Sequence, residues 1–185
     1  MRENYFAIDL KGYKNALFAS VASLHDPDAD FKAAEFDADT FSGRKKELKR
    51  LKPDIVYVRG HTLDFNRKAL EAPETTILSR PYPIDNTLAK IAARQEKAFE
   101  ICAADIIRSR GYPRARMIQS ISRTVMLARK YSIPLAITSG AKDIYSLVTP
   151  RELVSFGMLV GLDCPSAKAC ISNVASRILE RGRST

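Results

Sequence analysis

The sequence has no tryptophan, and only two histidines and three cysteines among its 185 residues. The two histidines, His25 and His61, are too few for a histidine-rich metal site. Cys102, Cys164 and Cys170 are odd in number and form no C-x-x-C pair. This cysteine usage predicts buried free thiols rather than a disulfide framework, and it favours a reducing, cytoplasmic location.

The common enzyme motifs are also missing. There is no G-x-x-x-x-G-K-S/T phosphate loop, no G-x-G-x-x-G, no H-E-x-x-H and no G-x-S-x-G elbow. No stretch approaches the roughly 18 apolar residues of a membrane span. The opening "MRENYFAIDLKGYKN" lacks the order of charged, apolar and small residues found in a signal peptide. We therefore expect no contact with a membrane.

The charge of the chain is strongly basic and unevenly distributed. Thirty Lys and Arg stand against 21 acidic residues, a net charge of +9. Residues 26–39, "DPDADFKAAEFDAD", hold six acids and one lysine, so the remaining 29 basic and 15 acidic residues carry +14. A protein with this net charge attracts polyanions, above all nucleic acid, and the guanidinium groups of its many arginines match the geometry of phosphate.

Apolar runs alternate with helical patterns along the chain, which predicts parallel β-α-β units. The predicted strands are 4–10, 32–38, 54–60, 75–80, 98–103 and 134–141. The predicted helices are 13–24, 42–52 with Ser42 as N-cap, 63–71, one after Asp85, 114–131, and helices only from Pro150 onward. A regular eight-stranded barrel needs about 250 residues. We therefore expect an α/β fold in one domain, residues 1–185: a distorted or incomplete TIM-type (β/α) barrel with a helical C-terminal third. An open doubly wound sheet is the alternative.

Basic residues recur along the predicted helices. Arg116, Arg123 and Lys130 are seven residues apart and share a stripe of the longest helix, while Lys90 and Arg94 share a face of the preceding one. Solvated helix faces have the same pattern, but several such faces on a basic chain favour phosphate contact. No strand carries the paired aromatics of a base-stacking platform, so the expected partner is folded RNA or a duplex bound through its backbone.

Three carboxylates offer a rival interpretation. Asp9, Asp37 and Glu100 lie at or near the ends of predicted strands, where a barrel places its chemistry, so they could hold magnesium for a phosphoesterase. Asp9 and Glu100 could equally pair with Arg59 or Arg80 at the same rim. The turn "ITSGA" (137–141) either presents Thr138 and Ser139 to an anion or only closes a tight turn.

Four segments in order carry a family resemblance: "RGHTLDFNRKALE", "LAKIAARQEKAFEI", "SISRTVMLARKYSIPLAITSGA" and "TPRELVSFGMLVGL". Over residues 54–162, and more weakly through "FAIDL" before them, the chain resembles the ribonuclease P protein component 3 family. The resemblance implies a distorted barrel and a protein subunit of ribonuclease P, which removes 5′ leaders from precursor tRNA. It also implies that the RNA subunit carries the chemistry with bound magnesium, that the protein alone is inactive, and that component 2 is its protein partner. A general RNA chaperone is a further alternative.

The same barrel is shared with metal-dependent phosphoesterases whose ligands begin with H-x-H after the first strand. Here that place reads "IDLKG", which favours an RNA-binding protein with no catalytic residue, metal ligand or cofactor of its own. The resemblance assigns the Asn-Arg pair to Asn66 and Arg67, and assigns no function to His61. The residues expected to bind ribonuclease P RNA, and through it precursor tRNA, are Arg59, Asn66, Arg67, Lys68, Lys90, Arg94, Arg114, Arg116, Arg123, Arg129, Lys130, Thr138, Ser139, Lys142 and Arg151.

Overall fold

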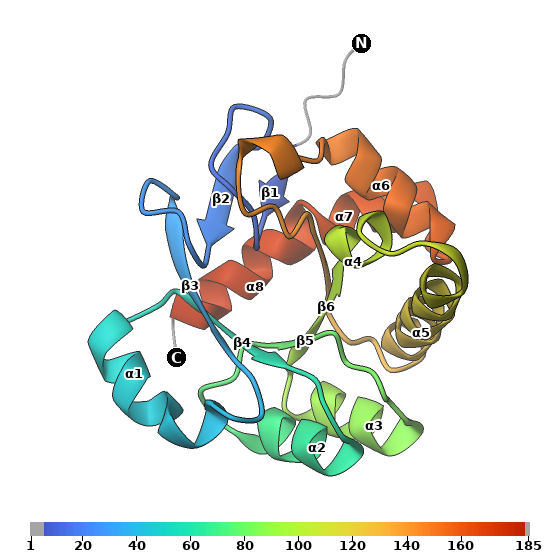
Figure 1. The fold of residues 1–185 in the computed structure, drawn as a ribbon. Coiled ribbons are helices and arrows are strands. Elements are labelled where there is room, and N and C mark those ends of the chain that lie inside the picture. Colours follow the sequence, from blue (N-terminus) through green and yellow to red (C-terminus); the bar gives the residue numbers. More distant parts are fainter. Residues whose placement is uncertain (1–5, 184–185) are drawn as a thin grey trace.

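Seven parallel strands form one sheet whose order follows the chain, from β1 to β7, and which curls into a nearly closed barrel (Figure 1). The computed structural model describes residues 6–183. The strands are β1 (Ile8–Asp9), β2 (Ser20–Ser23), β3 (Phe31–Phe36), β4 (Ile55–Arg59), β5 (Ile77–Ser79), β6 (Ala98–Cys102) and β7 (Leu135–Thr138). The predicted incomplete β/α barrel is confirmed, and the open doubly wound alternative is wrong. Residues 4 and 5 of the first predicted strand lie outside the described residues.

Helices surround this sheet and also make up the final third of the chain, as predicted (Figure 1). They are α1 (Arg44–Leu51), α2 (Leu63–Glu71), α3 (Asn86–Arg94), α4 (Ala103–Ile107), α5 (Gly111–Lys130), α6 (Pro150–Leu159), α7 (Cys164–Cys170) and α8 (Asn173–Arg183), with 3-10 turns η1 (Phe41–Gly43) and η2 (Ile144–Ser146). Asp85 caps α3 as predicted, since its side chain accepts a hydrogen bond from the Leu88 N–H. Ser42 does not cap α1, because it lies within η1 and the N-cap position is Gly43.

Residues 13–24 do not form the predicted helix. Their second half is strand β2, paired in parallel with β1 on one side and β3 on the other. Val21 packs on the outer face of the sheet and Ala22 on the inner face, which is the two-residue alternation of a strand. The helical spacing of Leu17, Phe18, Val21 and Leu24 was therefore misleading, because pairing with two neighbouring strands determines the backbone here.

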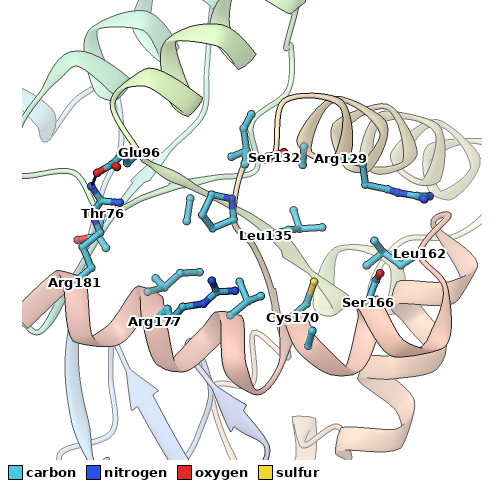
Figure 2. A pocket seen from close by; sticks show the side chains of 17 residues that line it. Thr76, Glu96, Arg129, Ser132, Leu135, Leu162, Ser166, Cys170, Arg177 and Arg181 are labelled. Carbon is cyan, nitrogen blue, oxygen red and sulfur yellow. Dashed lines mark hydrogen bonds and ion pairs between the residues drawn. The ribbon is translucent and has the colours of Figure 1, made fainter.

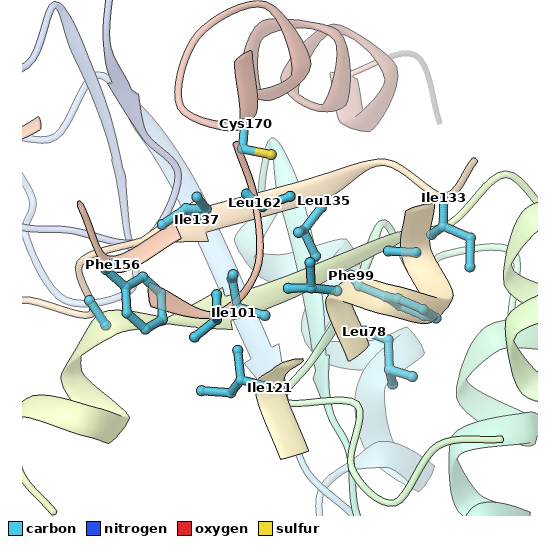
Figure 3. Close-up of a cluster of buried hydrophobic side chains, with 14 of the residues drawn as sticks. Leu78, Phe99, Ile101, Ile121, Ile133, Leu135, Ile137, Phe156, Leu162 and Cys170 are labelled. Carbon is cyan, nitrogen blue, oxygen red and sulfur yellow. The ribbon is translucent and has the colours of Figure 1, made fainter. Parts of the chain in front are cut away.

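The larger hydrophobic core lies between the sheet and its surrounding helices (Figure 3). Phe99 and Ile101 project outward from β6, and Leu135 and Ile137 from β7. The apolar stripe of α5 faces them, with Ile121 fully buried. Burying a side chain of this kind contributes about 1.5–3 kcal/mol, so this layer holds the helices in place around the strands.

A second core fills the interior of the barrel and is closed at one end by α8. Ile55, Ile77 and Ala98 begin strands β4, β5 and β6 and point inward, where Ile178 of α8 packs against them. Figure 1 shows α8 lying across the strands. The backbone of α8 comes so close to β4 that a Cβ on Gly182 would stand 2.3 Å from the Asp54 carbonyl oxygen. The end of the barrel at which the strands begin is therefore closed.

Strands β7 and β1 do not pair with each other among the described residues, so a seam separates them. The Gly140 N–H donates to the Lys11 carbonyl at 2.9 Å, where the two strands end. At the start of β1, the Ile8 N–H donates to the carbonyl of Ile171, between α7 and α8, at 2.7 Å. The C-terminal helices thus take the place that an eighth strand would fill. Within residues 6–183, no helix is both long and apolar enough to span a membrane.

Candidate functional site

The mouth of the barrel, where the strands end, is occupied by a buried lysine. Lys11 follows β1, and its Nζ lies 2.6 Å from Glu35 Oε1 and 3.3 Å from Glu100 Oε2. The same ammonium donates to Ser79 Oγ at 3.3 Å and stands 4.8 Å from the centre of the Tyr57 ring. Glu100 is fully buried, so without this cation its charge would face the low-dielectric interior alone.

The charges of this cluster support one another. Burial by itself would raise the pKa of Glu100, but the charges of Lys11 and Arg80, together with hydrogen bonds from Ser79 and Thr138, hold that pKa below its usual range. Burial would likewise lower the pKa of Lys11, yet Glu100 and Glu35 raise it above its usual value. Both groups are therefore ionised at neutral pH, and neither is poised to take up or release a proton there.

Arg80 forms a second ion pair beside the first. Its guanidinium contacts both carboxylate oxygens of Asp105, with distances of 2.7–2.9 Å, and its Nη1 lies 3.8 Å from Glu35. The Tyr82 hydroxyl donates to the same Asp105 carboxylate at 3.1 Å. A bidentate arginine–carboxylate pair fixes both side chains in one geometry, so the rim of the mouth is rigid at this point.

The carboxylates proposed as magnesium ligands do not converge. Asp9 is buried beside the seam, and its Oδ1 accepts the N–H groups of Lys11 and Ser139, each at 3.2 Å. Burial raises the pKa of Asp9, and these hydrogen bonds only partly oppose that effect. Asp37 is exposed and accepts hydrogen bonds from Thr40 instead. Glu100 pairs with Lys11, so no group of three potential metal ligands occurs in the part of the chain that the structure describes.

A polar hollow of about 270 Å³ opens above this cluster. Five basic side chains and two carboxylates are among the residues that line it: Lys11, Arg59, Arg80, Arg108, Lys142, Glu35 and Asp105. His25 lies at its edge as well. Arg59 and Lys142 were predicted as RNA contacts, and the structure brings them together here from the ends of β4 and β7. The hollow thus carries an excess of positive charge.

Three of the predicted RNA contacts are buried and already partnered, which corrects the prediction for them. Asn66 is fully buried; its amide donates to the Pro83 carbonyl and accepts from the His61 N–H, both at 2.9 Å. Thr138 donates to Glu100 Oε1 at 2.6 Å, and the Ser139 hydroxyl accepts from the Ala141 N–H at 3.0 Å. These side chains hold loops and the buried carboxylate, and they have no access to RNA in this structure.

The other predicted residues lie at or near the surface. Arg67 and Lys68 on α2, Lys90 and Arg94 on α3, and Arg116 and Arg123 on α5 are exposed. Helix α2 packs on α3 and α3 on α5, and Lys130 Nζ lies 3.3 Å from Asn86 Oδ1 at the start of α3. Two further residues are held locally: Arg114 donates to the Ser109 carbonyl at 2.7 Å, and Arg129 donates to the Gly161 carbonyl at 3.3 Å. Arg151 is exposed on α6, apart from this face.

The basic segment over α1 differs from these faces. Arg44 is half-buried, stacks on the Phe41 ring at 3.9 Å and lies 3.6 Å from Glu74. Arg50 pairs with Glu47 at 2.7 Å. Because these two arginines already have carboxylate partners, they are less available to phosphate than the exposed cations of α2, α3 and α5.

Sequence reasoning did not assign a role to Lys11, Arg108 or Tyr145. Lys11 and Glu100 are 89 positions apart, so only the closure of the barrel brings them together. Tyr145 is 96% exposed and stands on η2, beside Arg108. The one available signal was the "IDLKG" stretch, which places a lysine directly after the first predicted strand.

A different hollow, of about 460 Å³, lies at the opposite end of the strands (Figure 2). Its lining is mainly apolar, with Leu135 and Cys170 pointing into it. Arg129 stands at one edge, and an ion pair between Arg181 and Glu96 at the other.

All three cysteines are free, as expected from the sequence. Burial raises the pKa of the Cys102 and Cys170 thiols to about 12. Cys164 is half-buried, contrary to the prediction that all three would be buried.

The model of the family described as RNase P subunit p30 matches residues 35–185 of this chain. The chain belongs to this family. The curated relatives include ribonuclease P protein component 3 of Methanothermobacter thermautotrophicus, 35% identical over 137 residues that cover 71% of this chain and 56% of the relative. The same component of Methanosarcina mazei is 34% identical over 135 residues, covering 70% of this chain and 56% of the relative. The chain therefore spans about half the length of these relatives.

The fold of this p30-family member also matches a solved structure. A chain from the cryo-EM structure of an archaeal ribonuclease P with mature tRNA superimposes with a TM-score of 0.80 at 20% identity. The match covers 96% of this chain and 91% of that chain. At this identity the likeness shows that the two chains share a fold.

Proposed function

We propose that this chain is a protein subunit of ribonuclease P that binds and stabilises the catalytic RNA for removal of 5′ leaders from precursor tRNA. The family membership and the names of the relatives support this proposal. The observation that carries it is the face formed by α2, α3 and α5, whose exposed cations form no ion pair within residues 6–183. Its members are Arg67, Lys68, Lys90, Arg94, Arg116, Arg123 and Lys130.

Unpaired surface cations are suited to a phosphate backbone. Each one that contacts a phosphate releases condensed counterions from the RNA, and this release favours binding. Arg116 has an additional contact, since its guanidinium lies 5.9 Å from the centre of the Tyr112 ring, which orients it without neutralising its charge. Contacts of this kind hold the RNA backbone in place and carry little sequence information.

In this proposal the RNA subunit performs the chemistry and binds the magnesium ions, and the protein holds no cofactor. The mouth of the barrel supports that division of labour, because Lys11 stands between Glu35 and Glu100 where a cation would otherwise be needed. The protein partner that we propose is ribonuclease P protein component 2, with precursor tRNA reached through the RNA. The protein alone would be inactive, although it belongs to an endoribonuclease.

Reconstitution tests this function. The protein and component 2 are added to the RNA subunit at low magnesium, and release of the 5′ leader from precursor tRNA is measured. We expect stimulation over RNA alone, reduced by Arg116→Ala and Arg123→Ala. Arg177→Ala is the matched control, because Arg177 is exposed on α8 outside the proposed surface. An absence of stimulation would refute the proposal.

The rival functions have distinct outcomes. A phosphoesterase would hydrolyse phosphate esters without the RNA subunit, and EDTA or Glu100→Gln would abolish that activity. An RNA chaperone would bind unrelated structured RNAs as tightly as ribonuclease P RNA.

A further inference from the structure

Three cations at the mouth of the barrel have no carboxylate partner in the described part of the chain. Arg59 ends β4, Arg108 caps the end of α4, and Lys142 follows β7. All three are exposed and line the hollow of about 270 Å³. The deeper cations differ, because Lys11 and Arg80 are neutralised by buried or half-buried carboxylates. The three unpaired cations thus lie around the deeper part of the hollow, where the charges of Lys11 and Arg80 are balanced by those of their carboxylate partners.

An exposed aromatic ring stands beside one of these cations, Arg108. Tyr145 is 96% exposed and, with Arg108, lines a smaller hollow of about 130 Å³. Arg108 lines both hollows, so they adjoin. Ile107, 57% exposed, adds apolar surface to the smaller one. A tyrosine ring in this position leaves its apolar faces in water unless a second flat group covers them.

The backbone that carries Tyr145 is held firmly. Asp143 caps η2 by accepting the N–H groups of Tyr145 at 3.1 Å and Ser146 at 2.9 Å. The Ser146 hydroxyl in turn accepts the Asp143 N–H at 3.3 Å, which completes a capping box. Because the turn is fixed, little backbone entropy is lost when a ligand contacts the ring.

We propose that the mouth of the barrel binds one unpaired nucleotide of an RNA strand. Its phosphate lies in the polar hollow among Arg59, Arg108 and Lys142, and its base stacks on Tyr145. This proposal rests on the proposed RNA-binding function and names a second mode of contact within it: stacking of an unpaired base, in addition to backbone binding by α2, α3 and α5. Arginine forks match phosphate oxygens, and a tyrosine face accepts any base.

The test is the affinity of a fluorescein-labelled single-stranded oligoribonucleotide of about ten residues, measured by fluorescence anisotropy. Tyr145→Ala is expected to weaken binding about 5- to 160-fold, the usual range for loss of one stacked base. Tyr145→Phe keeps the ring and should bind like the original chain, and Arg177→Ala controls for loss of one exposed arginine elsewhere. Arg108→Ala should weaken binding and reduce the slope of log affinity against log salt by about 1. Melting temperatures of all variants confirm that they fold.

Two competition measurements distinguish an RNA-binding site from a site for a small phosphate-containing molecule. Inorganic phosphate and adenosine 5′-monophosphate are titrated as competitors; if either bound more tightly than the oligonucleotide, a small-molecule site would replace the proposed RNA contact. Equal affinity of the original chain, Tyr145→Ala and Arg108→Ala for the oligonucleotide would overturn the proposal. Failure here is distinguishable from failure of the proposed function, because reconstitution with ribonuclease P RNA depends mainly on Arg116 and Arg123.

Discussion

Replacing Lys11 by Met removes the only ammonium that contacts Glu100 in the described barrel mouth. Glu100 is fully buried, so its carboxylate would lose the partner that most lowers its pKa. Breaking one half of a buried ion pair typically costs about 3–5 kcal/mol of the free energy of unfolding. For a chain of this length, each kcal/mol shifts the melting temperature by roughly 2–4 °C, so we expect Lys11→Met to melt roughly 6–20 °C lower.

The loss of unfolding free energy in Lys11→Met should depend on pH. The folded-state pKa of Glu100 is lowered, so the stability it contributes is present above its ordinary pKa and is lost as the pH falls through the lowered value. Without Lys11, burial dominates and the pKa of Glu100 rises, so protonation relieves the unpaired charge at a higher pH. The deficit of Lys11→Met relative to the original chain should therefore shrink between neutral pH and mildly acidic pH.

Urea unfolding followed by circular dichroism at several pH values measures this deficit. The double variant Lys11→Met with Glu100→Gln should regain much of the loss, because neither charge remains. Lys14→Met is the matched control: Lys14 pairs with Asp30 near the surface, where an ion pair contributes at most about 1 kcal/mol. A Lys11→Met deficit below about 1 kcal/mol, or one that stays constant with pH, would refute the reasoning.

Three further predictions concern separate parts of the molecule. If about six phosphates are neutralised, a plot of log RNA affinity against log salt concentration should have a slope of about −5. The double variant Arg116→Ala with Arg123→Ala should reduce that slope by about 2 without altering the melting temperature. An unchanged slope would show that α5 does not contact the RNA. Asn66→Ala should cost about 2–4 kcal/mol in urea unfolding, because two backbone groups lose their partner; a loss below 1 kcal/mol would show that water replaces them. Gly140→Ala should lower the melting temperature, since its φ of +67° is left-handed and an added Cβ would stand 2.4 Å from the Cys102 sulfur; an unchanged melting temperature would contradict this.

The strands from β4 to β7 were predictable because each is a short run of apolar residues buried on both sides. Strand β2 was not, because its apolar residues also fit a helix and only the neighbouring strands decide between the two. The same limit applies to the mouth: Lys11 and Glu100 are far apart in sequence, and nothing near either residue indicates the other.

The exposed cations of the candidate surface were predictable from helical spacing, as for Arg116 and Arg123. Burial was harder to foresee. Asn66 lies in the first half of a short helix and Thr138 at the end of a strand, where a polar side chain is commonly exposed, yet both are buried and hydrogen-bonded to other parts of the chain. The role of Tyr145 was equally hidden, because its sequence neighbours do not show that η2 lies beside Arg108.

The closure of the barrel by α8 has a consequence for the order of folding. Helix α8 follows the seven described strands, yet its Ile178 and Leu179 pack into the interior that those strands enclose. During synthesis, the inner faces of β4, β5 and β6 emerge from the ribosome before the residues that cover them. Until α8 has been made, these faces present an apolar surface to chaperones and to other unfinished chains, so the final native packing is a late, cooperative event.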